Sequence, residues 1–168
     1  QNLHLIKNVI LPVEFAPART VATSLIAQTA MLCIVLVMSG YGGMLTGSIL
    51  LLPLVLVLEF LFVLGCVYII SALGVLLADV AHVINLLMLL LFFLSPIGFK
   101  PEMIPPGLEA IITYNPVYYI TDAFRAALFY GEIANMKVFL IYVVICLVTF
   151  VVGAAFFHRF KTVLVDYE

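Results

Sequence analysis

Charged residues are scarce in this chain of 168 amino acids. Asp, Glu, Lys and Arg make up 10% of it, whereas about a quarter of a typical soluble domain is charged. The net charge is −2, and the seven Lys and Arg residues are scattered along the chain. Without a basic cluster there is no field to attract nucleic acid or anionic lipid head groups. The sequence therefore predicts no nucleic-acid partner.

The usual marks of a chemical site are missing too. The three His residues are far apart and have no metal-ligand spacing. The three Cys residues lie in apolar runs and are expected to pack as small hydrophobic side chains. Gly42 and Gly47 have the outer spacing of a phosphate-binding loop, but Ser48 follows where that loop requires Lys. We expect no catalytic residue, metal or cofactor in this chain, so any ATP is hydrolysed by another polypeptide.

Apolar residues are abundant. They make up 66% of the sequence and give it a mean hydropathy of +1.32. A soluble globule of this size could not bury so much apolar surface, so lipid is the solvent for most of the chain. A membrane-crossing helix needs about 20 mostly apolar residues. We predict an all-α integral membrane protein with four spans, at residues 20–39, 49–78, 80–96 and 138–157.

The region between the last two spans, residues 98–137, is apolar but is broken by prolines and carries seven charged residues. Asn115 and Pro116 suit the cap and first turn of a helix, which we expect to run to Tyr130 and to stop at Gly131. So short a helix cannot cross a membrane, and broken backbone at membrane depth must be buried in protein or line a wet cavity. We therefore predict a re-entrant pair of short helices, residues 106–114 and 116–130.

A few polar residues stand out in or beside the spans. Glu59 is the one carboxylate inside a confident span; it either contacts the translocation path or joins two helices through a hydrogen bond. Asp79 and His82 lie at a hairpin tip and mark either a solvated turn or a contact with a cytoplasmic partner. Asp122 and Arg125 are three residues apart on the predicted helix and can pair locally.

Two further segments have two interpretations each. The segment from Leu5 to Arg19 is stiffened by Pro12 and Pro17 and carries Glu14; it is either an interfacial helix or a docking element for a soluble motor. Aromatic side chains also crowd the re-entrant region, as either a membrane-interface belt or a collar of flat faces for sugar rings. They are Tyr114, Tyr118, Tyr119, Phe124, Phe129 and Tyr130.

Three stretches together resemble the permease subunits of ABC-type exporters of polysaccharides and polyol phosphates, which carry O-antigen, capsule and teichoic acid. LIKNVILPVEFAPAR resembles their hydrophobic-basic-x-x-x-Pro-x-Glu-x-x-Pro segment. LLADVAHVINLLMLLLFFLSPIGFKPEMIP resembles their Asp-Val-x-His hairpin and Ser-Pro-Ile connection. YNPVYYITDAFRAALFYG is similar to their Asn-Pro element. One departure is Leu77-Ala78, where the family often has Arg before the turn aspartate.

The resemblance implies a full subunit with six spans, of which this chain lacks the amino-terminal interface helix and the first span. It implies a homodimer of permeases working with two ATP-binding cassette ATPases, which hold the ATP and Mg. Residues 1–19 would be a cytoplasmic coupling segment, with Pro12, Glu14, Pro17 and Arg19 touching the ATPase and Asp79 and His82 on a second cytoplasmic turn. Residues 105–131 would form two outer-leaflet re-entrant helices that line the exit, and residues 158–168 a cytoplasmic tail.

The sequence therefore predicts a multi-pass transport subunit, not an enzyme, in the cell membrane of a bacterium or archaeon, with both ends of this chain cytoplasmic. We expect it to export a lipid-linked glycan or polyol-phosphate polymer. The exit residues would be Glu59, Tyr114, Asn115, Pro116, Tyr118, Tyr119, Asp122 and Arg125. The alternatives are a drug, lipid or peptide exporter of the same superfamily, an ion-coupled secondary carrier, and a structural assembly factor.

Overall fold

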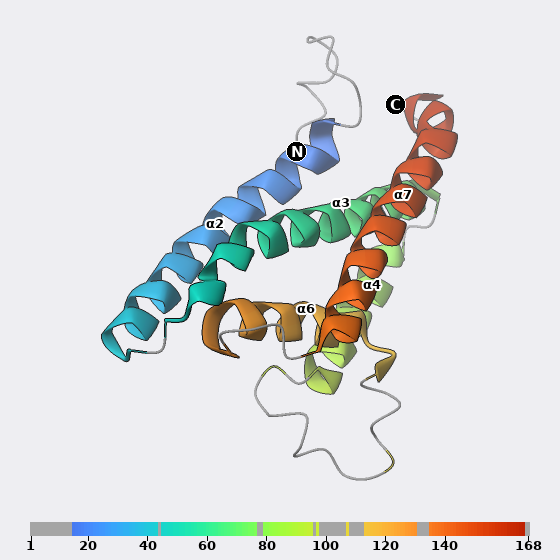
Figure 1. Cartoon of the computed structure of the whole chain (residues 1–168). Helices are drawn as coiled ribbons and strands as arrows, with labels where there is room; N and C mark the ends of the chain where they lie inside the picture. Colours follow the sequence, from blue (N-terminus) through green and yellow to red (C-terminus); the bar gives the residue numbers. More distant parts are fainter. Residues whose placement is uncertain are drawn as a thin grey trace.

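Helices form all the regular structure in the part of the chain that the computed structural model describes, which is residues 15–43, 45–76, 79–95, 97, 107, 113–130 and 135–166. The elements are α2 (Phe15–Tyr41), η1 (Gly47–Leu51), α3 (Leu52–Leu76), α4 (Val80–Leu94), α6 (Pro116–Arg125), η3 (Ala126–Tyr130) and α7 (Met136–Asp166) (Figure 1). The predicted all-α class is confirmed.

Helix α2 begins at Phe15, five residues before the predicted span, and includes Pro17 in its first turn. The first-turn amides of a helix have no carbonyl partner within the helix, so proline is tolerated there. Pro17 and Arg19 therefore belong to α2 itself and not to a separate segment before it. The helix ends at Tyr41, and Gly43 follows with a φ of 65°, a left-handed conformation that favours glycine.

The predicted second span is divided between two kinds of helix. A 3-10 turn, η1, leads directly into the α-helix α3, which begins at Leu52. Pro53 lies in the first turn of α3. The change of helix type coincides with this proline, whose missing amide removes one backbone hydrogen bond.

Three helices are long and apolar enough to cross a membrane among the residues described, where four spans were predicted. They are the segments Pro17–Tyr41, Gly47–Gly74 and Met136–Phe160. The predicted third span is the 15-residue helix α4, which is about five residues shorter than a perpendicular crossing needs. It ends at Leu94, just before Ser95-Pro96, because a residue that precedes proline is disfavoured in helical conformation.

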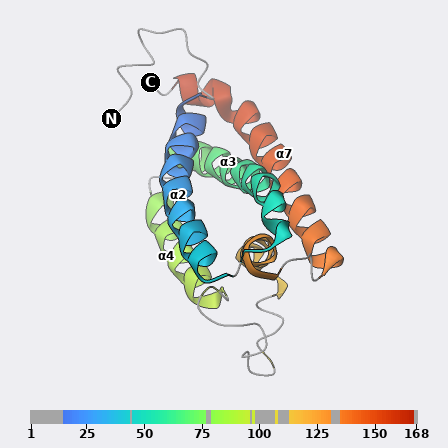
Figure 2. The ribbon, with the colours of Figure 1, turned by 60° about the vertical axis from the view of Figure 1, so that its left-hand side comes forward.

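Helices α3 and α7 cross at two glycines that bring their backbones into contact. A Cβ atom added to Gly65 would stand 2.5 Å from the carbonyl oxygen of Thr149, and one added to Gly153 would collide with the backbone of Gly65. Small residues permit such close approach, which membrane helices use where lipid provides no hydrophobic driving force. This crossing is the tightest helix contact in the fold, and Figure 2 shows the two helices side by side.

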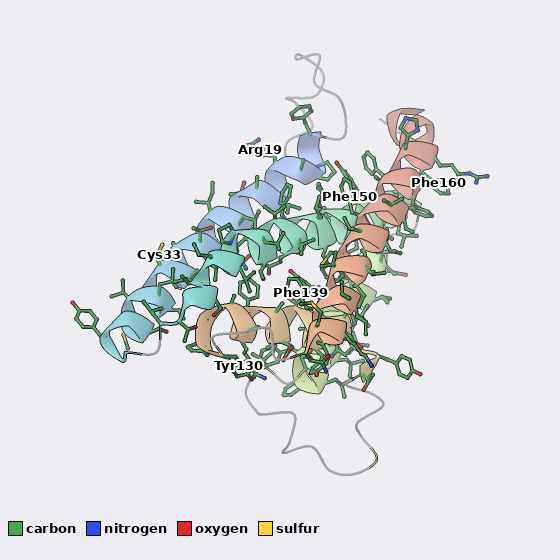
Figure 3. All side chains as sticks on the ribbon, in the orientation of Figure 1. Arg19, Cys33, Tyr130, Phe139, Phe150 and Phe160 are labelled. Atoms are coloured by element: carbon green, nitrogen blue, oxygen red, sulfur yellow. The ribbon has the colours of Figure 1, made fainter. Side chains whose placement is uncertain are left out.

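The two ends of the bundle carry different elements. The first turn of α2 and the last turn of α7 lie at the same end in both views (Figures 1 and 2). Figure 3 places Arg19 and Phe160 toward that end and Tyr130 toward the opposite end. Helix α6 lies near this opposite end, where α2 finishes and α3 and α7 begin.

Candidate functional site

Helix α6 begins with a buried polar junction to the end of α4. The Asn115 side chain accepts a hydrogen bond from the Val117 amide at 2.9 Å, so Asn115 is the predicted helix cap. Its Nδ2 atom donates to Ser95 Oγ at 2.8 Å, and the Ser95 hydroxyl donates to the Leu91 carbonyl. Ser95 and Asn115 are 2% and 4% exposed. Since a buried polar group without a partner is costly, these bonds fix the start of α6 against α4.

Two further hydrogen bonds hold α6 along its length. The Tyr119 hydroxyl donates to the Thr113 carbonyl at 2.7 Å, across the turn that contains Asn115. Near the other end of the helix, Arg125 Nη2 donates to the Ile97 carbonyl at 3.3 Å. The segment that follows α4 therefore contacts α6 at both ends.

One face of α6 packs into the main core of the bundle. Tyr119, Ala123 and, in the following turn, Ala127 are buried there. The other members of this core lie on η3, α3 and α7: Leu128, Leu52, Val55, Leu58, Tyr142 and Cys146. The contact extends from the start of α3 to Leu58 and along α7 to Cys146, about 10 to 15 Å at 1.5 Å per residue. That length is roughly a third to half of the thickness of a 30 Å hydrocarbon layer.

A polar stripe runs along α6 beside its buried face, and its first member, Tyr118, also packs against the core. Tyr118, Asp122 and Arg125 follow one another at helical spacings of four and three residues and are half-buried. Burial raises the pKa of the Asp122 carboxyl, and the positive charge of Arg125 opposes that rise. The pKa of Tyr118 is raised by burial and further by the charge of Asp122. These groups form one electrostatically coupled stripe along the helix.

Glu59 lies at a second polar contact, between spans. Gln28 Nε2 on α2 donates to Glu59 Oε2 on α3 at 2.6 Å. One turn away, the buried Tyr142 hydroxyl on α7 donates to the Val55 carbonyl of α3 at 2.9 Å. The geometry favours the interpretation of Glu59 as a residue that joins two helices, and it adds a third helix through Tyr142.

The structure places the remaining predicted residues as follows. Tyr114 is exposed, Pro116 is the first residue of α6 and half-buried, and Pro17 is buried in the first turn of α2. Arg19, Asp79 and His82 are exposed, and the Asp79 side chain makes no cap hydrogen bond to α4. Pro12 and Glu14, and the helix predicted at residues 106–114 except for Gly107, Thr113 and Tyr114, lie outside the described residues.

Several contact residues were not singled out from the sequence. Tyr142, Gly65 and Gly153 each looked like an ordinary residue within an apolar run. Ser95 was noted only as part of the Ser-Pro-Ile connection, without a contact to α6. The two glycines could have been recognised as contact residues from their position inside predicted spans, because glycine weakens a helix unless it allows close packing. Among the described residues, no group of three or more His, Cys, Asp or Glu could hold a metal ion.

Long apolar helices, with a short amphipathic helix held among their ends, define a polytopic α-helical membrane protein. Residues 18–129 match the family described as ABC-2 type transporter. The chain belongs to this family, and the match includes the α6 site.

The chain is also similar to three permeases of known designation. Two are O-antigen export system permease proteins RfbA of Klebsiella pneumoniae, 27% and 28% identical over 110 residues, which cover 66% of this chain and 42% of each relative. The third is the O-antigen export system permease protein RfbA of Myxococcus xanthus, 26% identical over 125 residues, or 73% of this chain and 48% of the relative. The chain thus spans about half the length of the relatives that it matches.

Proposed function

We propose that this chain belongs to the membrane subunit of an ATP-driven exporter, and that its cargo is a lipid-linked polysaccharide or polyol-phosphate polymer. Membership of the ABC-2 type transporter family supports the first statement. The designation of the similar proteins as O-antigen export permeases supports the second. The exporter works with a separate ATPase subunit that holds ATP and Mg.

The observation that carries the proposal is the placement of α6. Its apolar face packs against the starts of α3 and α7, while Asp122 and Arg125 lie in a half-buried polar stripe beside that face, with Tyr118, which also packs against the core. At membrane depth, such groups must border water or protein because lipid cannot satisfy them. In this proposal the bilayer thins around the short helix α4, which acts as the fourth span. Helix α6 is re-entrant from the outer side, and its polar stripe lines the exit.

Polymer passage needs a wider path than one bundle provides. We place that path between two copies of the permease, with Asn115 and Pro116 setting the position of α6 and Tyr114 and Tyr118 offering ring faces to sugars. Tyr119, expected from the sequence to belong to the exit, is buried in the main core and instead holds α6 in place. In this proposal the first turn of α2 and the last turn of α7 face the cytoplasm. Two groups of residues transmit the movement of the ATPase to α2, α3 and α4. One is Pro12, Glu14, Pro17 and Arg19, and the other is Asp79 and His82.

Reconstitution tests the proposal directly. The full-length permease and its ATPase are placed in vesicles with a lipid-linked glycan, and glycan that reaches the far side is measured. We expect transport that needs ATP and stops when the ATPase cannot hydrolyse it. Transport that survives without the ATPase would favour an ion-coupled carrier. ATP-dependent movement of a small drug, with no movement of glycan, would favour the drug-exporter alternative.

A further inference from the structure

The carboxyl end of the α6 segment has an unusual geometry. After Arg125 the α-helix becomes a π-helical turn, η3, whose residues Ala126, Ala127 and Leu128 are buried. The predicted helix of residues 116–130 therefore has the expected extent but changes type along it. Turns of this kind are rare and are frequently found at functional sites.

A residue from a distant part of the chain holds this turn. Ser48, in the η1 turn between α2 and α3, is 7% exposed, and its hydroxyl donates to the Ala127 carbonyl at 3.2 Å. Carbonyls in the last turn of a helix depend on partners from outside the helix. Ser48 is such a partner for the α6 segment.

A second hydroxyl supports the first. Thr46 Oγ1 and Ser48 Oγ are 2.8 Å apart, and either could donate. Since a hydroxyl has a single hydrogen and Ser48 uses its own on Ala127, Thr46 must be the donor. The chain of bonds therefore runs in one direction, from Thr46 to Ser48 to the π turn, and each bond polarises the next.

We propose that Ser48 is a positioning residue for the polar stripe of α6: it holds the π turn against the α2–α3 connection. This inference rests on the proposed function, because it assigns to the α2–α3 connection the role of passing helix movement to the exit. When α2 and α3 shift together, the bond carries η3 with them and reorients Tyr118, Asp122 and Arg125. When the bond is absent, the end of α6 is released from the two spans.

The test uses a thiol reporter in the π turn. Phe129, which is 42% exposed, is replaced by Cys in a full-length permease whose native cysteines have been removed, and its labelling by a membrane-impermeant maleimide is timed in vesicles with the ATPase present. Loss of one net hydrogen bond of average strength corresponds to about a fivefold change in the open population. We therefore expect Ser48→Ala to speed labelling about fivefold, and Ser48→Thr, which keeps the hydroxyl, to restore the slow rate.

Ser24→Ala is the matched control, because the Ser24 hydroxyl bonds only to the Thr20 carbonyl of its own helix among the described contacts. Its labelling rate should equal that of the parent. Equal rates in Ser48→Ala and the parent, or the same acceleration in Ser24→Ala, would overturn the inference.

If Ser48→Ala does not accumulate in membranes, Thr46→Val replaces it, with an expected acceleration of about twofold, and an unchanged rate again overturns the inference. ATP-dependent glycan export is measured in the same vesicles, so its absence in the parent would count against the proposed function while leaving the labelling result to decide the role of Ser48.

Discussion

At the scale of single residues, the contact between Gln28 and Glu59 separates two interpretations of an intramembrane carboxylate. The hydrogen bond of 2.6 Å between these side chains joins α2 to α3. A residue that only joins helices needs an acceptor at this position and does not need a charge. A residue that carries a coupling ion needs the carboxylate itself. The two roles therefore respond differently to the loss of charge alone.

We expect Glu59→Gln to retain most ATP-dependent export, because the new amide oxygen can still accept from Gln28. Glu59→Ala removes the acceptor and should lower the free energy of unfolding by about 0.6 to 1.7 kcal/mol, the range for hydrogen bonds between membrane helices. Export by the vesicle assay and unfolding in mixed detergent measure the two effects. Abolished export in Glu59→Gln with normal stability would restore the ion-coupled interpretation.

The junction between Ser95 and Asn115 offers a second residue-scale prediction. Asn115→Ala removes both the cap of α6 and the donor to Ser95, and should destabilise the protein by about 1 to 3 kcal/mol. Ser95→Ala should cost less, because the cap survives. A double-mutant cycle of the two residues, read from unfolding midpoints, should give a coupling of at least about 0.5 kcal/mol. Additive effects would mean that the two side chains do not act together.

Asp122 predicts a dependence of stability on pH. Burial raises its pKa in the folded protein above the ordinary 3.8, although Arg125 opposes the rise. At pH values between 3.8 and the folded-state pKa, the folded state binds more protons than the unfolded state. The contribution of Asp122 to stability is therefore greatest at low pH. It is lost as pH rises from about 3.8 through the folded-state pKa. Asp122→Asn should flatten this part of the profile in thermal unfolding measured over a pH series. Curves of identical shape for the two proteins would contradict the prediction.

At the scale of elements, the α3–α7 crossing depends on two glycines. Because a Cβ on Gly65 would stand 2.5 Å from the Thr149 carbonyl oxygen, Gly65→Ala must push the helices apart. We expect a loss of about 1 to 3 kcal/mol, as in other overpacked interiors, measured by unfolding in mixed detergent. Gly74→Ala is the control on the same helix, because nothing lies within 4 Å of its added Cβ. It should be neutral or slightly stabilising.

Element identities followed from the sequence wherever a local signal sufficed. Apolar runs indicated the long helices, and Asn115-Pro116 indicated the start of α6. Local signals could not give the early start of α2, because Pro17 reads equally well as a break before a helix or as a first-turn residue. The polar face of α6 was visible in the spacing of Asp122 and Arg125. Its contacts were not, because Ser48 and Ser95 are brought to α6 by tertiary packing and have no distinctive spacing.

At the scale of the whole molecule, the arrangement of ends predicts a pattern of access. Arg19 and Phe160 lie toward one end of the bundle and Tyr130 toward the other (Figure 3). In the proposed orientation, cysteines placed at the exposed positions Arg19 and Arg159 should be labelled only when the impermeant reagent is added to the cytoplasmic side. A cysteine at Tyr130, which is 48% exposed, should react from outside. Labelling of all three positions from one side would contradict both the topology and the re-entrant placement of α6.

The contact at Gly65 and Gly153 also determines how α7 can rotate relative to α3. Where backbones touch, no side chain can be compressed to absorb motion, so α3 and α7 can change their angle only by turning about Gly65 and Gly153. From Gly153 to Met136 at the far tip of α7, the arm is about 25 Å at 1.5 Å per residue. A rotation of about 10° at this pivot would sweep the tip through roughly 4 Å on that geometry. A small tilt imposed on α7 near its last turn would thus be passed to the end where α6 lies.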